Sequence, residues 1–158
     1  MFFHGGAFCF GTPAIARAAT SRLALMSKAM VVVPKYGLAP EHCVHEIIDQ
    51  GVAAYLHVVN PVGEGGLGVD PSRITIAGSP NLTILYFIQN LGESAGASLA
   101  LQVMLRLRSE AVIKKYNCPR TMPRCAVLIS PWVDLTTTVR VKRPLTPSKC
   151  VIFFSSLL

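Results

Sequence analysis

Short apolar runs alternate with longer helical patterns along this chain, and the alternation narrows the folds open to it more than any other feature. The runs are "MFFHGG", "AMVVVPKY", "RITIAG" and "RCAVLIS". Between them, residues 13–28, 44–59 and 95–108 are predicted helices, and two of these place apolar side chains along one helical face. Strands that alternate with helices predict a parallel sheet covered by helices on both faces, with right-handed crossovers.

Length, charge and cysteine usage restrict the class of protein. The chain has 158 residues, which indicates one domain, and 51% of them are hydrophobic. The formal net charge of +7 does not follow a recognisable nucleic-acid-binding module, so nucleic acid is not an expected partner. Five cysteines without a CxxC spacing predict reduced thiols. The sequence shows no signal peptide and no apolar run near the ~20 residues of a membrane helix, which favours a cytoplasmic protein.

A five-residue stretch, Gly92-Glu93-Ser94-Ala95-Gly96, fits the G-x-S-x-G pattern of a nucleophile elbow. A serine on a tight turn between strand and helix exposes its Oγ, and the flanking glycines remove Cβ atoms that would collide with neighbouring backbone. The helix that follows offers free N–H groups and a positive dipole to an oxyanion. The same residues also fit an ordinary helix start rich in small side chains.

A second motif, "HGGAF", covers His4 to Phe8 and ends a predicted strand upstream of Ser94. It is similar to the HGGG-type loop that donates N–H groups to the oxyanion hole of lipases and esterases. Gly5 and Gly6 allow backbone amides to approach a substrate carbonyl. A Gly-Gly loop by itself does not indicate an oxyanion hole. Here "HGGAF" precedes the G-x-S-x-G motif, as in these enzymes, so each motif supports the interpretation of the other.

These motifs and three others resemble the hormone-sensitive-lipase family of carboxylesterases, which have the α/β-hydrolase fold. The resemblance covers Phe2 to about Thr136. It departs from the family at Gly37, where arginine is usual, and at Ala7, where a third glycine is common. The matching residues are His4-Gly5-Gly6-Ala7-Phe8, Tyr36 with Leu38-Ala39-Pro40-Glu41-His42, Asp70-Pro71-Ser72-Arg73-Ile74, Gly92-Glu93-Ser94-Ala95-Gly96 and Ser130-Pro131-Trp132-Val133-Asp134-Leu135.

The resemblance implies a partial α/β-hydrolase fold in residues 1–138: a mostly parallel central sheet of family strands 3–6 flanked by helices, with the lid and last strands missing. It also implies hydrolysis of small carboxylic esters with short or medium acyl chains, through an acyl-enzyme on Ser94 and without metal or cofactor. The implied oxyanion hole is formed by N–H groups of Gly5, Gly6, Ala7 and Ala95. The remaining motif residues are His4, Gly92, Glu93 and Gly96.

A catalytic base is missing from the expected place. The triad of this fold runs serine, acid, histidine along the chain, yet no histidine follows Ser94, since the four histidines are His4, His42, His45 and His57. We therefore expect this chain to be impaired or inactive. The pair His42 and His45 beside Cys43 lacks a second cluster, so no metal site is expected.

Residues 79–92 separate the strand "RITIAG" from the elbow it should enter. Without them the chain reads "RITIAGESAGASLALQ", so we interpret 79–92 as a probable insertion, translated from an intron or from a gene-model error. Residues 139–158 form an off-family tail of basic and apolar residues. Two segments compete for one sheet position, and we favour "RITIAG" over "TILYFI" because "DPSRITIAG" keeps the family spacing to the preceding helix.

Two other functions stay open at this point. Plant gibberellin receptors resemble the same family and bind a small molecule without catalysis, so this chain could be a non-catalytic binding homologue. It could also be a non-functional fragment. The sequence does not indicate an oligomeric state.

Overall fold

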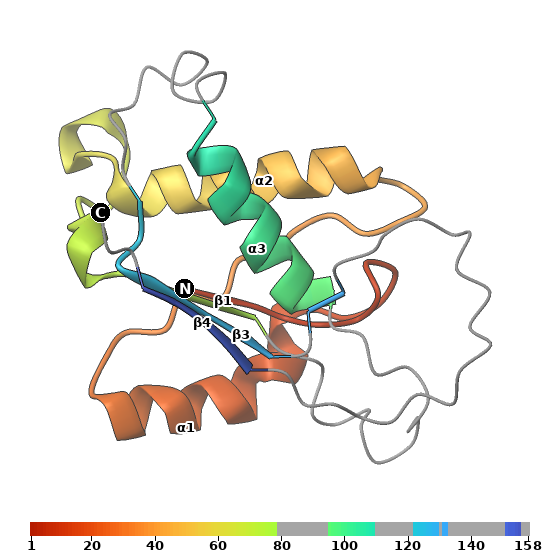
Figure 1. Ribbon diagram of the computed structural model, residues 1–158, viewed down its shortest axis with the longest axis horizontal. Helices are drawn as coiled ribbons and strands as arrows, with labels where there is room; N and C mark the ends of the chain where they lie inside the picture. The colour runs from red at the N-terminus through yellow and green to blue at the C-terminus, as the bar shows by residue number, and fades with distance from the viewer. Residues whose placement is uncertain (79–94, 110–121, 130, 133–150, 156–158) are drawn as a thin grey trace.

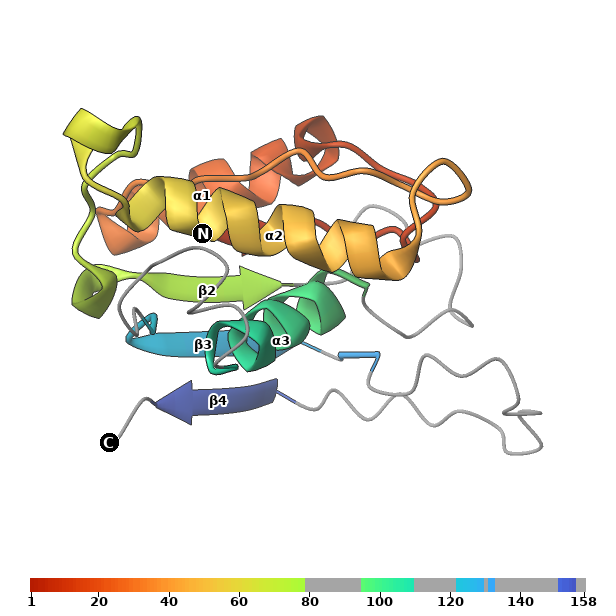
Figure 2. The ribbon, with the colours of Figure 1, turned by 90° about the horizontal axis from the view of Figure 1, so that it is seen from above.

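The computed structural model describes residues 1–78, 95–109, 122–129, 131 and 132, together with the backbone of 151–155. Its described sheet has the strand order β1-β2-β3-β4. The strands are β1 Phe2–Phe3, β2 Thr75–Gly78, β3 Cys125–Ile129 and β4 Val151–Ser155. The first three are parallel neighbours, whereas β4 runs antiparallel to β3 (Figure 2).

Helices lie on both sides of this sheet, as the alternation of elements predicts (Figure 1). Helix α1 is on one side, and α2 and α3 cross each other on the opposite side. The α-helices are α1 Arg17–Ser27, α2 Val44–Val59 and α3 Ala95–Leu107. Short 3-10 helices are η1 Pro13–Ala16, η2 Val62–Glu64 and η3 Pro71–Arg73. No helix in the described part of the chain is long and apolar enough to cross a bilayer.

Helix α2 follows directly from its sequence. Apolar side chains recur at helical spacing, and Ile47, Val52 and Tyr55 on that face are fully buried. The helix ends before Asn60-Pro61, since proline cannot continue it. Gly51 lets α3 come close, because a Cβ atom there would lie 2.7 Å from Cγ2 of Val103.

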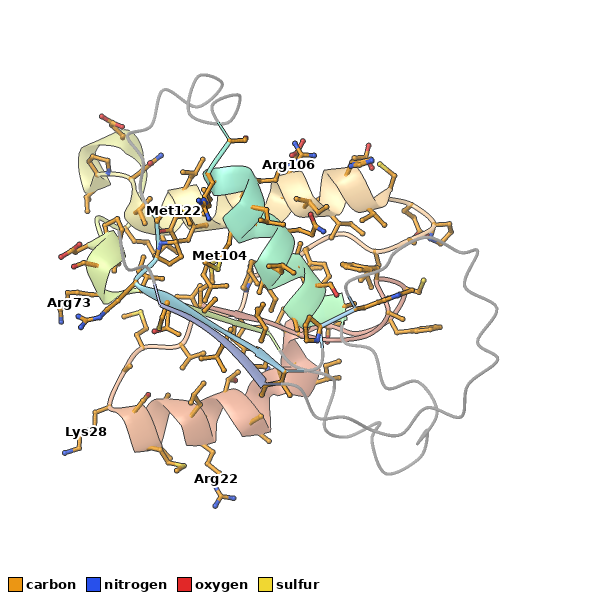
Figure 3. The ribbon with its side chains drawn as sticks, in the orientation of Figure 1. Arg22, Lys28, Arg73, Met104, Arg106 and Met122 are labelled. Atoms are coloured by element: carbon orange, nitrogen blue, oxygen red, sulfur yellow. The ribbon has the colours of Figure 1, made fainter. Side chains whose placement is uncertain are left out.

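The core lies between the sheet and the pair α2 and α3. Outside this core, Arg106 of α3, labelled in Figure 3, forms an ion pair with Asp49 of α2 at 3.6 Å. Arg22 and Lys28 project from the α1 region away from the sheet. The largest fully buried apolar side chains are Tyr55, Phe3, Ile47, Ile76, Leu99, Leu128, Val52 and Val103.

Strand β2 enters the sheet through a capped turn. The N–H and Oγ of Ser72 donate hydrogen bonds of 2.9 and 2.7 Å to the Asp70 carboxylate, and these bonds lower the pKa of that carboxyl group. After this turn, Thr75–Gly78 pairs with β1 on one side and with β3 on the other. "RITIAG" therefore occupies the contested position, as favoured from the sequence, while "TILYFI" lies outside the described residues.

Two expectations about strands were wrong. Residues 29–36 form no strand, and one backbone bond, from the Phe2 N–H to the Val32 carbonyl at 2.8 Å, joins them to β1. This single bond to the two-residue β1 is not the ladder of bonds that defines a pair of strands. The parallel sheet is thus three-stranded. Strand β4 was not expected either; an antiparallel strand needs no helical crossover, so a short segment can pair with the open edge of β3.

Candidate active site

The loop that follows β1 has its carbonyl groups held in place one after another. The hydroxyl of Tyr36 donates to the carbonyl oxygen of His4. Nδ1 of the His4 ring lies 3.0 Å from the carbonyl oxygen of Gly5. The N–H groups of Cys9 and Phe10 donate to the carbonyl of Gly6 at 3.0 and 2.8 Å. Three successive carbonyls of this loop therefore have fixed partners.

Three amide N–H groups of the same loop have no such partner in the described part of the chain. Among the described residues, no hydrogen bond uses the N–H of Gly5, Gly6 or Ala7. Each of these N–H groups shares a trans peptide with one of the three held carbonyls, and the two groups of a trans peptide point in opposite directions. Fixing the carbonyls therefore aims the N–H groups the other way. An array of free, oriented amides is suited to binding a negatively charged oxygen.

The loop has an unusual backbone at its centre. Gly6 has a φ of 138°, and a Cβ atom there would collide with the backbone of Phe10. Ala7 and Phe8 follow with φ values of 52° and 61°, in the left-handed region that side chains rarely adopt. Ala7, which replaces the glycine common in the family, is thus accommodated at a position that favours glycine.

The N-terminus of α3 packs directly against this loop. A Cβ atom on Gly96 would lie 2.6 Å from the carbonyl oxygen of His4, and still closer to that of Phe3. A Cβ atom on Gly78, at the end of β2, would lie 2.5 Å from the nitrogen of Ala97. The two glycines therefore allow β1, β2 and the start of α3 to meet backbone to backbone. Ala95 is fully buried at this junction.

Tyr36 and His4 form a buried pair beneath the loop. Their rings are stacked, with centroids 4.3 Å apart and an angle of 14° between the planes. The Tyr36 hydroxyl also lies 3.1 Å from Nδ1 of His4. Burial raises the pKa of Tyr36 and lowers the pKa of His4, and the hydrogen bond to Gly5 opposes the shift at His4. Both side chains are therefore held in their uncharged forms at neutral pH.

Trp132, one of the two described residues of the segment "SPWVDL", is bonded to α3 through its backbone. Ser98, which is buried on the second turn of α3, donates a hydrogen bond from Oγ to the carbonyl oxygen of Trp132. Trp132 is partly buried against the core. This bond connects the segment after β3 with the helix that begins at the elbow. Sequence reasoning did not identify Ser98, because a serine inside a helical pattern has no distinguishing spacing.

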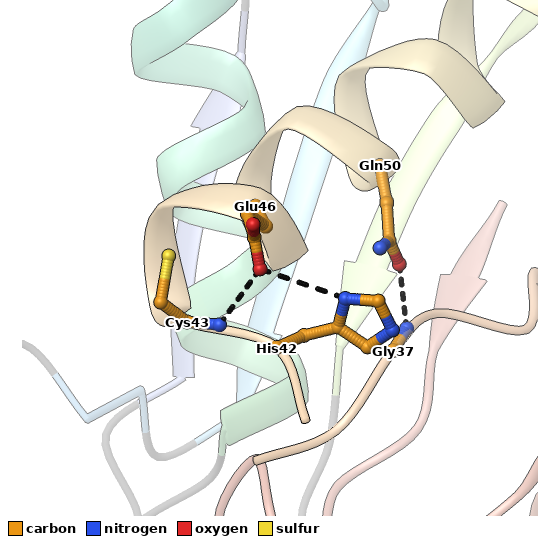
Figure 4. Close-up of polar contacts among 5 residues, drawn as sticks. All are labelled: Gly37, His42, Cys43, Glu46 and Gln50. Atoms are coloured by element: carbon orange, nitrogen blue, oxygen red, sulfur yellow. Dashed lines mark hydrogen bonds and ion pairs between the residues drawn. The ribbon is translucent and has the colours of Figure 1, made fainter. Parts of the chain in front are cut away.

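The two histidines His42 and His45 flank the start of α2. Oε2 of Glu46 lies 3.5 Å from Nδ1 of His42 and accepts a 3.0 Å bond from the N–H of Cys43 (Figure 4). His45 is exposed. Among the described residues, no three His, Cys, Asp or Glu side chains come together as metal ligands would. The cluster caps the helix instead.

Figure 4 also accounts for Gly37, where the family usually has arginine. Its N–H donates a 2.6 Å bond to Oε1 of Gln50, and a Cβ atom at this position would lie 2.6 Å from Cγ of His42. The imidazole ring of His42 occupies the space that a side chain at residue 37 would need. Glycine at position 37 therefore leaves room for the ring of His42.

The elbow itself lies partly outside the described residues. Gly92, Glu93 and Ser94 are among those left undescribed, whereas Ala95 and Gly96 begin α3 immediately after them. The structure thus brings together His4, Gly5, Gly6 and Ala7 with Ala95 and Gly96 at the carboxyl end of β1. His57 lies on the exposed surface of α2.

Comparison with known proteins gives one consistent family. Residues 1–80 and 88–155 match the model of a family described as alpha/beta hydrolase fold. The unmatched residues 81–87 fall inside the interval 79–92.

Curated relatives include an esterase of Acinetobacter venetianus and an acetyl-hydrolase of Streptomyces hygroscopicus. They are 33% and 30% identical over 135 residues, which is 85% of this chain in each case. The chain spans only about a third of their length, 35% and 36%.

Solved structures agree with these relatives. A hormone-sensitive lipase from a metagenome library superposes with a TM-score of 0.59 at 32% identity, over 84% of this chain and 36% of its own. EstE1, a thermostable carboxylesterase from a metagenomic library, gives 0.60 at 28% identity, over 86% and 38%. Sequence and structure together show that the chain belongs to the alpha/beta hydrolase fold family of hormone-sensitive-lipase-like proteins, whose fold it adopts in part.

Proposed function

We propose that this chain carries the nucleophile and the oxyanion-binding half of a serine carboxylic ester hydrolase. The observation that carries the proposal is the loop after β1, where three carbonyls are held and no other described residue bonds the N–H groups of Gly5, Gly6 and Ala7. This loop lies against the first turn of α3, directly after Ser94. A substrate carbonyl bound there would lie beside the start of α3, the helix that follows Ser94 in the sequence.

In the proposed reaction, Oγ of Ser94 attacks the carbonyl carbon of a small ester. The carbonyl oxygen gains negative charge, and the amides of Gly5, Gly6, Ala7 and Ala95 stabilise it. One such donor is worth about 10²–10³-fold in rate in a well-studied serine protease. Collapse of the tetrahedral intermediate expels the alcohol and leaves an acyl group on the serine, which water then hydrolyses.

We further propose that the 158 residues alone turn over slowly. A serine hydroxyl is a weak nucleophile without an adjacent base. No histidine follows Ser94 in the sequence, and Nδ1 of His4 is already bonded within the loop. Loss of the base costs on the order of 10⁶-fold in one measured serine protease. The names esterase and acetyl-hydrolase of the two relatives support esters with short acyl groups as substrates.

Hydrolysis of p-nitrophenyl acetate tests the proposal. We expect the chain to release p-nitrophenol slowly and to retain an acetyl group on Ser94, detectable by mass spectrometry of the intact protein and of its peptides. Ser94→Ala should abolish both signals. Ser27→Ala is the matched control, because it removes the Oγ of an exposed serine that donates a local hydrogen bond to the Leu23 carbonyl.

Two results would contradict the proposal. One is equal hydrolysis by wild type and Ser94→Ala, which would mean that the activity does not use this serine. The other is acetylation that persists in Ser94→Ala and is mapped to a different residue.

A further inference from the structure

The contacts of Tyr36 define where the hydrogen atoms of this buried pair must lie. Its hydroxyl has one hydrogen, and the carbonyl oxygen of His4 can only accept, so the hydroxyl donates there. The remaining close contact, 3.1 Å between the hydroxyl oxygen and Nδ1 of His4, then requires Nδ1 to be the donor. The structure thus specifies the proton on that ring nitrogen.

The carbonyl of Gly5 leads to the same assignment independently. Its oxygen lies 3.0 Å from Nδ1 of His4 and can only accept a hydrogen bond. A bare Nδ1 would direct its lone pair at this oxygen and at the Tyr36 oxygen. The hydrogen on Nδ1 is therefore shared between two acceptors. Burial of the ring keeps it uncharged by lowering the pKa of His4, which leaves Nε2 without a hydrogen.

The segment that contains Tyr36 holds the loop at both ends. Tyr36 binds the carbonyl of His4 at the start of the loop, and the N–H of Ala39 donates a 2.8 Å bond to the carbonyl of Phe8 at its end. Gly5, Gly6 and Ala7 lie between these two attachment points. The loop is thus held by a distant segment, since Tyr36 lies 32 residues after His4 in the sequence.

We propose that Tyr36 is a positioning residue for the oxyanion loop: its hydroxyl fixes the Nδ1–H tautomer of His4, and the two side chains together orient the N–H groups of Gly5 and Gly6. The hydroxyl holds the His4 carbonyl, and the ring holds the Gly5 carbonyl. In each trans peptide the N–H group then points away from the held carbonyl. What these N–H groups bind rests on the proposed function; the positioning does not.

Nitrogen-15 NMR of the histidine side chains tests the tautomer without any substitution. We expect His4 of the wild-type chain at pH 7.5 to show a protonated, pyrrole-type Nδ1 and an unprotonated Nε2. A protonated Nε2 with a bare Nδ1, or two protonated nitrogens, would overturn the proposal even if no variant folds.

Tyr36→Phe tests the positioning, with Tyr55→Phe as the matched control. Both remove the hydroxyl of a buried tyrosine, but that of Tyr55 has no hydrogen-bond partner among the described residues. We expect the backbone amide resonances of Gly5 and Gly6 to move in Tyr36→Phe and to stay in place in Tyr55→Phe. Equal shifts in the two variants, or none in Tyr36→Phe, would refute the positioning role.

Phenylboronic acid links this positioning to the proposed function, because its boron forms a negatively charged tetrahedral adduct with a serine Oγ. We expect Tyr36→Phe to weaken its binding by about two- to tenfold, the value of one hydrogen bond, and Tyr55→Phe to leave it unchanged. Unaltered affinity in Tyr36→Phe would refute the proposal. If Ser94→Ala binds as tightly as wild type, the proposed function fails instead, and the NMR results alone decide whether Tyr36 positions the loop.

Discussion

Replacing Gly96 by alanine tests the backbone junction on which the site depends. The new Cβ atom would lie 2.6 Å from the carbonyl oxygen of His4 and 2.8 Å from its carbon, with the carbonyl oxygen of Phe3 closer still. Ordinary contact begins at 3.4 Å, so the His4 oxygen would have to move by about 0.8 Å. These atoms belong to backbone that is held by β2 and by Tyr36, so they cannot rotate away as a side chain could.

Two opposing terms decide the size of the effect. Alanine in place of glycine favours a helix by up to about 1 kcal/mol. Overpacking of a close-packed interior costs about 1–3 kcal/mol, and rigid backbone neighbours place this site at the upper end. We therefore expect the free energy of unfolding to fall by about 1–2 kcal/mol. Urea titration followed by the fluorescence of Trp132, the only tryptophan of the chain, measures it.

Gly63→Ala is the matched control for this experiment. A Cβ atom on Gly63 would meet nothing within 4 Å, and its φ is not in the left-handed region. We expect this variant to lie within about 0.5 kcal/mol of wild type or to be slightly more stable, because alanine restricts the unfolded chain. The reasoning fails if Gly96→Ala is as stable as wild type, since the three backbones would then not meet at this point.

Four further substitutions probe buried polar groups. Tyr55→Phe removes a buried hydroxyl without a partner among the described residues, so the free energy of unfolding should rise by up to about 1 kcal/mol. Tyr36→Phe removes a bonded hydroxyl, so the free energy of unfolding should fall by about 1 kcal/mol. Urea titrations in which both variants change stability in the same direction would contradict this. Because burial lowers the pKa of His4, the unfolded chain takes up a proton below about pH 6.5 that the folded chain does not, so stability should fall as the pH drops from 7.5 to 5.5. His4→Asn should reduce that slope, and an unchanged slope would exclude His4 as its source. Ser98→Ala should lower stability by about 1 kcal/mol and shift the emission of Trp132 to the red; unchanged emission would argue against the bond between them.

Local patterns in the sequence predicted most helices and the central strands. The spacing of apolar residues predicted a helix over 44–59, and α2 is Val44–Val59. A helix over 95–108 is observed as Ala95–Leu107, and the strand predicted within "RCAVLIS" is Cys125–Ile129. The helix predicted over 13–28 is split, since Pro13 begins a 3-10 turn before α1 starts at Arg17. These features depend on neighbours within a few residues, which the sequence displays directly.

The family was also readable from the sequence. "HGGAF" and G-x-S-x-G are short local patterns, each set by the turn or helix start in which it lies. Their order along the chain indicated the family. The lack of a histidine after Ser94 is likewise a property of the sequence alone.

Tertiary structure alone decided which strands pair and how the loop is held. Residues 29–36 have the composition of a buried strand, yet they form none, whereas the apolar residues Val151–Ser155 of the tail pair with β3. The contact of Tyr36 with His4 and the approach of Gly96 to β1 join residues that are far apart in the chain. No periodicity encodes such contacts, because they arise only when the sheet and α3 bring separate segments together. The sequence displayed the glycine-rich motif after β1, and only the packing of Tyr36 against His4 showed how the carbonyl groups of that motif are held.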